Sequence, residues 1–214
     1  MSLVLTIDTA SPIFAIALSG DGVFAGAATG EEPQDQTRLL VRAIDSLLGK
    51  RRRELTGIVV VEGPGSYAGL RVGLATASAL ALATGARQVG VTVFEALAAL
   101  ALEPGEWSAI QPLGRDQLAL QAFRGMEPMG VPHTSHARSV AERHLVGEGA
   151  RALGGQEVDP KTRCIGALRA GLVKLAAAEA AGETDDPAAL YLSEPRITPA
   201  KRSPLAPEAP ALGA

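Results

Sequence analysis

Short apolar segments separated by turn-forming residues open the chain. Leu3 to Ile7, Ile13 to Ser19 and Val23 to Ala28 each have the length of a buried strand. Ser11-Pro12 separates the first two segments, and Gly20-Asp21-Gly22 separates the second from the third. Turn residues of this kind between short apolar runs are typical of strands that pair with their neighbours. The pattern predicts a three-stranded antiparallel meander.

A helical period follows the meander. Over residues 35–48 apolar side chains recur every three or four residues, with Gly49 just after the last of them. This pattern predicts an amphipathic helix. Ile58 to Val61 is apolar without alternation, as in a strand that is covered on both faces. A second helix is expected over residues 68–84.

A strand at Gln88 to Val91 and a helix at Phe94 to Leu102 complete the first series of expected elements. The pattern of strands followed by helices then restarts near residue 105. After it we expect strands at Trp107 to Pro112, Gln117 to Phe123 and His144 to Val146, then a short helix and a long one over residues 165–181. The repetition predicts two α/β lobes, residues 1–104 and 105–196. The proline-rich residues 197–214 are expected to be a disordered tail.

The second helix has no polar face. Between Ala68 and Ala83 its only charge is Arg71, and a helix that is apolar all round must be covered on all sides. The small residues at four-residue spacing form a ridge that would let another helix approach closely. We therefore predict a partner surface on this helix and on the first one, comprising Leu40, Ile44, Leu47, Gly69, Leu70, Gly73, Ala77 and Ala81. Covering by the chain's own helices is the alternative.

Composition narrows the class of protein. The 20 lysines and arginines against 23 acids give a net charge of -3, which argues against a protein whose main task is to bind nucleic acid. The run Lys50 to Arg53 either ends a helix in solvent or contacts RNA phosphates. Cys164 is the only cysteine, which indicates a reducing, cytoplasmic setting. We expect neither a signal peptide nor a membrane span.

The stretch IVVVEGPGSYAGLRVG, residues 58–73, breaks from a strand over glycines into a helix. Ser66 lacks the flanking glycines of a nucleophile elbow, since Pro64 and Ala68 stand there. The stretch also lacks the lysine of a P-loop. Ser66 is expected to cap the helix. Weak candidates for holding an anion are Gly63, Gly65, Ser66 and Arg71.

Two other segments carry candidate chemistry. Asp8 and Ser11 resemble the phosphate hairpin of the actin, Hsp70 and sugar-kinase superfamily, but Ala10 replaces the glycine that a phosphate needs beside the backbone. The resemblance makes an actin-like ATPase or small-molecule kinase, with a Mg-nucleotide at the Asp8 hairpin, the alternative function. His133 and His136 lie in a segment that reads as a loop, and their spacing predicts no metal site.

Longer motifs resemble a known family. LTIDTASPIFAIAL, GPGSYAGLRVGLATASALA, VGVTVFEALA and, more weakly, LVGEGA and ALYLSEP occur in this order over most of the first 195 residues. They resemble the TsaB (YeaZ) family, the non-catalytic subunits of the bacterial machinery that makes threonylcarbamoyladenosine in tRNA.

The resemblance implies an actin-like, two-lobed fold without a functional ATPase site, no cofactor and no catalytic residue. It implies a heterodimer with a TsaD-like transferase through the first two long helices, a TsaE-like ATPase as further partner, and a possible homodimer through the same helices. Contact with tRNA would be indirect or weak. Glu148 intrudes on a turn where superfamily relatives place adenosine-binding glycines. Gln36-Thr37 departs from the family's His-Ser pair, and residues 124–143 match nothing in the family pattern.

Overall fold

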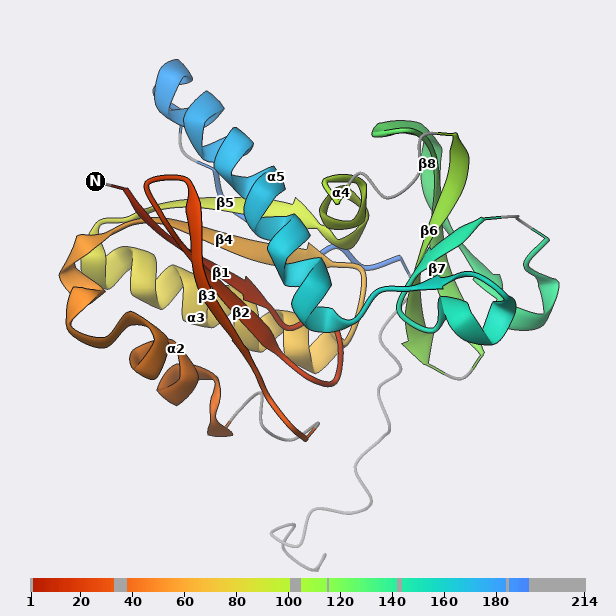
Figure 1. Cartoon of the computed structure of the whole chain (residues 1–214), viewed down its shortest axis with the longest axis horizontal. Coiled ribbons are helices and arrows are strands. Elements are labelled where there is room, and N and C mark those ends of the chain that lie inside the picture. The colour runs from red at the N-terminus through yellow and green to blue at the C-terminus, as the bar shows by residue number, and fades with distance from the viewer. Residues whose placement is uncertain are drawn as a thin grey trace, which may run out of the picture.

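The computed structural model describes residues 2–32, 38–100, 105–114, 116–141, 144–183 and 185–192. Within these residues the strands form two five-stranded sheets (Figure 1). The first sheet contains β1 (Leu3–Asp8), β2 (Ala15–Gly20), β3 (Val23–Thr29), β4 (Leu55–Gly63) and β5 (Arg87–Thr92). The second contains β6 (Glu106–Gly114), β7 (Gln117–Arg124), β8 (Glu127–His136), β9 (Leu145–Gly147) and β10 (Gln156–Glu157).

Both sheets have the same topology. The strand order is β3-β2-β1-β4-β5 in the first and, read from the corresponding edge, β8-β7-β6-β9-β10 in the second. In each, an antiparallel meander is extended by two parallel strands on the far side of its first strand. The predicted meander and the prediction of two α/β lobes are therefore confirmed.

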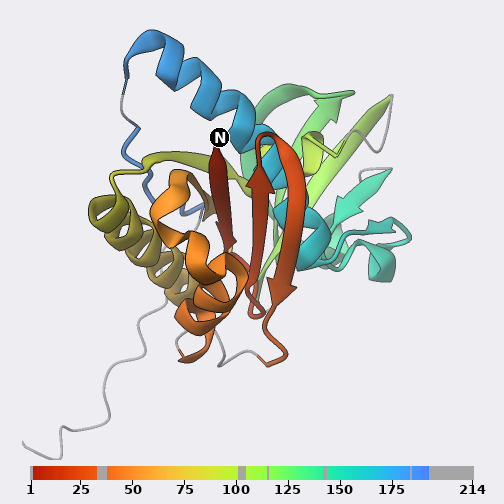
Figure 2. The ribbon, with the colours of Figure 1, turned by 60° about the vertical axis from the view of Figure 1, so that its left-hand side comes forward.

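Helices cover both faces of the first sheet. On one face lie α2 (Leu40–Leu48) and α3 (Tyr67–Thr84), and on the other lies α5 (Pro160–Ala181) (Figure 2). The alternation of β4 explains this arrangement, because Ile58 and Val60 join the core under α2 and α3 whereas Val59 and Val61 join the core under α5. All four are fully buried. The prediction of a strand covered on both faces is confirmed.

Capping residues fix where the helices begin and end. Ser66 accepts a hydrogen bond from the Gly69 N–H at the start of α3, and Gly85 ends that helix in the left-handed conformation. Asp159 accepts from the N–H groups of Lys161 and Thr162 at the start of α5. The short helix α4 (Val93–Ala98) begins with a capping box between Thr92 and Glu95.

Strand β8 corrects one prediction. Its segment contains Pro128, Gly130 and Pro132 and was expected to be a loop, yet it pairs with β7 on both sides of a register shift at residues 130–132. Proline is tolerated there because β8 is an edge strand, so one side of its backbone needs no partner. His133 and His136 consequently lie on a strand.

The lobes are less separate than the sequence suggests. The boundary near residue 105 does fall between the sheets, but α5 packs on β1, β2, β4 and β5 of the first sheet. Its start at Pro160, five residues before the predicted one, places its first turn between the two sheets. Residues 185–190 also return to the first sheet, where the Leu190 N–H donates to the Glu62 carbonyl (2.8 Å).

Several predictions fall on residues outside the described ranges. These are the start of the first helix at residues 35–37 and the tail over residues 197–214. The third helix, predicted to reach Leu102, ends at Ala98 instead. The 3-10 helices η1 (Gly49–Glu54), η2 (Ala137–Ser139) and η3 (Ala150–Leu153) complete the described elements. None of the described helices combines the length and the apolar character that crossing a membrane requires.

Candidate functional site

A buried arginine joins the two lobes. Asp8 is the last residue of β1, and Gln111 lies in the second half of β6, the equivalent strand of the other sheet. The first turn of α5 brings Arg163 between them, with only 1% of its side chain exposed. The Asp159 cap fixes this turn, so the direction of the guanidinium group is set by the start of the helix.

All five N–H groups of Arg163 have acceptors. Nε donates to Asp8 Oδ2 (2.8 Å) and Nη2 to Asp8 Oδ1 (3.0 Å), a bidentate ion pair. Nη2 also donates to Ser11 Oγ (2.8 Å). Nη1 donates to Gln111 Oε1 (2.6 Å) and to Glu148 Oε2 (3.2 Å). We call Asp8, Ser11, Gln111, Glu148 and Arg163 the Arg163 cluster.

Glu148 closes the cluster from the second lobe. Its carboxylate accepts a hydrogen bond from the Ser11 hydroxyl and another from Gln111 Nε2 (3.3 Å). Its side chain is 24% exposed, so it forms the solvent edge, whereas Asp8 is fully buried. Glu148, singled out in the sequence within its glycine turn, thus reaches Ser11 of the first lobe.

Charge pairing determines the ionisation of the cluster. Burial alone would lower the pKa of Arg163, but the charges and hydrogen bonds of Asp8 and Glu148 more than offset burial and raise that pKa. Burial, and secondarily the charge of Asp8, raises the pKa of the neighbouring Cys164 thiol well above its usual value. The thiol therefore stays protonated, which suits a small core residue and not a nucleophile.

The arrangement leaves little for a ligand to bind. The guanidinium of Arg163 has no spare donor for a phosphate, and it occupies the space between two carboxylates where a bound cation would otherwise be attracted. Asp8 Oδ1 accepts a further hydrogen bond from the Ala10 N–H (3.0 Å). The carboxylate that would hold a hydrated metal in a phosphate hairpin is thus bound to groups of its own chain.

The glycine turn before α3 also binds its own chain. The Ser66 N–H donates to the Ala10 carbonyl (2.7 Å), and a Cβ on Gly65 would lie 2.2 Å from the same oxygen. Gly63 has a φ of 118°, which favours glycine. Arg71 lies over the Tyr67 ring, 5.5 Å from its centroid. Gly65 is therefore needed for close approach to the Asp8 turn, and Ser66 serves as the predicted cap.

The ridge of small residues on α3 faces inward. A Cβ on Gly73 would lie 2.2 Å from the Thr9 hydroxyl oxygen, so the missing side chain makes room for the chain's own turn. Of the residues predicted as a partner surface, the chain itself buries Leu40, Ile44, Gly69, Leu70, Gly73 and Ala77, and Leu47 and Ala81 are half-buried. That surface prediction is corrected: these residues pack against the first sheet.

The opposite side of α3 is exposed and still largely apolar. We call Ala68, Ala75, Ala79, Leu82 and Ala83 the outer face of α3; all are exposed, and Leu82 is 89% exposed. Exposed Arg71 and Ser78 are the polar residues beside them. Near the start of the helix, the exposed ring of Tyr191 contacts Tyr67 with 5.0 Å between centroids. Segment 185–192 therefore ends beside this face.

Acidic and metal-ligating residues elsewhere form no evident centre. Glu62, whose carboxylate accepts from the Ala188 N–H (2.9 Å), has a raised pKa because burial disfavours its charge. Lys174 pairs with Glu95 nearby (2.8 Å). Over the described ranges, no three His, Cys, Asp or Glu residues are arranged to hold a metal ion.

Comparison with known proteins relates this geometry to one family. The family model described as "TsaD: tRNA N6-adenosine threonylcarbamoyltransferase" matches residues 34–114. A Pseudomonas aeruginosa structure described as similar to the peptidase YeaZ matches with a TM-score of 0.72 at 18% identity, over 90% of this chain and 100% of that one. YeaZ from Pseudomonas aeruginosa matches with a TM-score of 0.69 at 19% identity over the same shares.

The chain has the YeaZ fold. The resemblance to the TsaB (YeaZ) family, first seen in sequence motifs, is thereby confirmed at the level of the fold, which has two mixed sheets flanked by helices. No curated protein sequence matches the chain.

Sequence reasoning missed Arg163 and Gln111. Arg163 is four and eight residues before Ala167 and Gly171, both buried, so it stands on the apolar side of its helix. A charge in that position requires a buried partner of opposite sign, which was a usable signal. The identity of the partner was beyond reach, because Asp8 is 155 residues away.

Proposed function

We propose that the protein is a non-catalytic subunit of a tRNA threonylcarbamoylation system, and that it dimerises with a TsaD-type transferase. The YeaZ fold and the match of residues 34–114 to the TsaD family model support this assignment. The match includes α2 and α3, so the part of the chain most similar to a TsaD-type protein carries the helices of the proposed interface.

The outer face of α3 is the observation that carries the proposal. A helix with exposed alanines and Leu82 and a single charge is typical of a surface that is covered in an assembly. Alanine side chains let a facing helix approach closely. Tyr67 and Tyr191 add the aromatic area that interfaces favour.

The Arg163 cluster supports the proposal that this chain catalyses no reaction of its own. An actin-like ATPase or kinase would need Asp8 and Ser11 to hold a Mg-nucleotide, and both are engaged by Arg163. No observation favours that alternative. In the proposed role the protein needs no cofactor of its own and works in the cytoplasm. It contributes a surface to the transferase, with a TsaE-type ATPase as a further partner and a homodimer through the same face when the transferase is absent.

The interface is tested by placing charges on the exposed side of α3. Ala75→Glu with Ala79→Glu should weaken binding to the TsaD-type transferase by about 100-fold or more, because two unpaired carboxylates would be buried in the contact. The variant should remain folded, since both positions face solvent. Co-purification gives the affinity, and a reconstituted assay of threonylcarbamoyladenosine formation in tRNA gives the activity.

The matched control is Ala176→Glu with Ala177→Glu, two exposed alanines on α5 at the other side of the sheet. It should leave both readouts unchanged. Wild-type affinity in the α3 variant would show that the interface lies elsewhere. Full modification activity in the absence of this chain would refute the proposed function itself.

A further inference from the structure

Basic residues are concentrated in one segment of the first lobe. Of the 20 lysines and arginines six lie within residues 38–53, and of the 23 acids only Asp45 does, so the rest of the chain has 14 basic and 22 acidic residues. A chain with a net charge of -3 thus carries a strongly positive segment on an otherwise acidic surface. We call Arg38, Arg42, Lys50, Arg52 and Arg53 the basic rim; all five are exposed.

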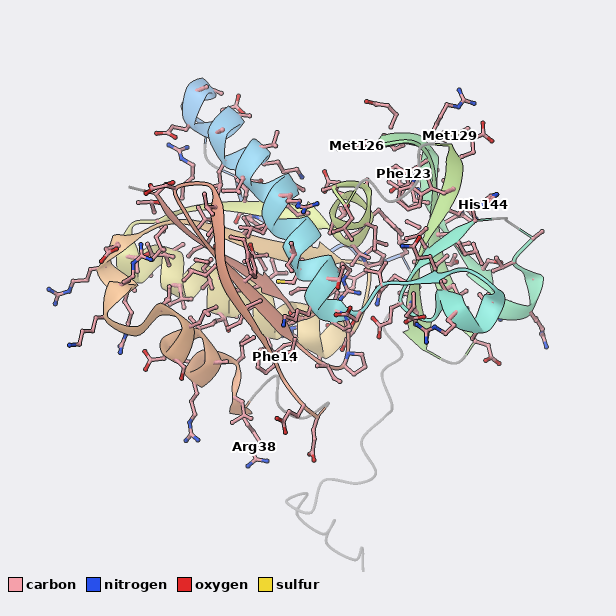
Figure 3. All side chains as sticks on the ribbon, in the orientation of Figure 1. Phe14, Arg38, Phe123, Met126, Met129 and His144 are labelled. Atoms are coloured by element: carbon pink, nitrogen blue, oxygen red, sulfur yellow. The ribbon has the colours of Figure 1, made fainter. Side chains whose placement is uncertain are left out.

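Two elements hold the basic rim in place. Arg42 lies on α2 and Arg38 lies two residues before the first residue of that helix. Figure 3 shows Arg38 directed away from the molecule below α2. The remaining three residues follow on η1, which continues directly from α2. Arg51 is half-buried, close to Gly20 of β2, and pairs with Glu54 (2.9 Å). Four of the five rim residues therefore lie on two adjoining helical elements and not in a loop.

Most of its charge is unneutralised. Arg52 pairs with Asp45 (2.8 Å), but over the described ranges no acidic side chain forms an ion pair with Arg38, Arg42, Lys50 or Arg53. Exposed arginines elsewhere differ, as Arg124 pairs with Glu106 across β6 and β7 (2.6 Å). These four cations lie within one 16-residue segment, 38–53, and an anionic partner would neutralise them.

We propose that the basic rim binds the phosphate backbone of tRNA. Several exposed cations along one segment suit the repeated charges of a nucleic acid strand, and Arg contacts phosphate in a bidentate manner. Val41 is the exposed large apolar residue among the rim positions, whereas a protein contact would call for an apolar or aromatic centre. The inference rests on the proposed function, in which the assembled transferase acts on tRNA.

Salt dependence is the readout that a phosphate contact predicts. Each phosphate neutralised by a cation contributes about 0.9 to the slope of log affinity against log salt concentration for a duplex and about 0.7 for a single strand. Removing Arg42, Lys50 and Arg53 should therefore lower the magnitude of this slope by about 2 to 3. Affinity near 0.1 M salt should fall by about tenfold or more.

The experiment compares Arg42→Gln/Lys50→Gln/Arg53→Gln with wild type by fluorescence anisotropy, using an unmodified tRNA transcript at several KCl concentrations. It is run on the chain alone and on its complex with the transferase. Arg124→Gln/Lys161→Gln removes exposed cations at two other places and should leave the slope unchanged.

Three outcomes would overturn the inference: an unchanged slope, an equal loss in the control variant, or weaker binding to the transferase with tRNA binding by the chain alone intact. The third would identify the rim as a contact for an acidic protein surface. Transferase binding by the α3 variant is measured separately, so failure of the proposed function and failure of the tRNA contact are distinguishable.

Discussion

Replacing Arg163 with alanine is expected to lower the free energy of unfolding by about 3 to 5 kcal/mol, the range for breaking a buried ion pair by removal of one partner. The substitution leaves the Asp8 carboxylate in a fully buried position without its bidentate partner. It also removes the hydrogen bonds that Arg163 donates to Gln111 and Ser11. Urea unfolding followed by circular dichroism would measure the change.

Two further variants separate charge from geometry. Arg163→Lys keeps the charge, but an ammonium has three donors without the planar fork, so it should recover only part of the loss. Asp8→Leu with Arg163→Met removes both charges and should be more stable than Arg163→Ala alone, because apolar pairs of similar volume often replace buried ion pairs without loss. Arg124→Ala, at an exposed pair, should change stability by less than about 1 kcal/mol. A small effect of Arg163→Ala would mean that the cluster does not hold the lobes together.

Gly65→Ala is expected to cost about 2 to 3 kcal/mol, near the upper range for overpacking. The new methyl group would lie 2.2 Å from the Ala10 oxygen, 2.8 Å from its carbonyl carbon and 2.9 Å from its Cα. All three are backbone atoms, which cannot turn away as a side chain end does. The turn would have to separate from Ala10 and lose the hydrogen bond from the Ser66 N–H. Thermal and urea unfolding should both report the loss.

Gly105→Ala is the matched control, because no atom of another residue lies within 4 Å of its added Cβ. It should change stability by no more than about 0.5 kcal/mol, as for other surface substitutions. Gly57→Ala gives an intermediate test, since the nearest atom is the Leu175 methyl group at 2.8 Å, the end of a side chain that can move. Equal stability of the Gly65 and Gly105 variants would contradict the close approach of the turn to β1.

The sequence predicted the elements whose signals are local. The short apolar segments and turns of the first 28 residues predicted the meander, and the position of Ser66 before an apolar helix predicted its role as a cap. Strand β8 was missed because Pro128, Gly130 and Pro132 have the composition of a loop, and only pairing with β7 makes the segment a strand. The β-propensity of the residues is a weak guide at an edge strand, because packing against neighbouring strands decides whether the segment forms a strand.

The site was predictable in part. Asp8 and Glu148 were both recognised as unusual, one in a degraded phosphate hairpin and the other intruding on a glycine turn. That a guanidinium would join them depends on how α5 crosses between the sheets, which no local pattern encodes. The direction of the small-residue ridge on α3 was wrong for a related reason. Periodicity shows that Gly69 and Gly73 share one side of a helix, but the position of Thr9 decides that this side faces inward.

The placement of α5 also bears on how the chain is made. A ribosome releases the first sheet long before residues 160–181, so the face bearing Val4, Val59 and Val61 has no cover while the second sheet is synthesised. Folding of the first lobe must therefore wait for the end of the chain, and transient protection of this face by a chaperone would be an advantage. A gene fragment ending at the connection between the sheets would yield an insoluble product, even though it encodes a complete five-stranded sheet.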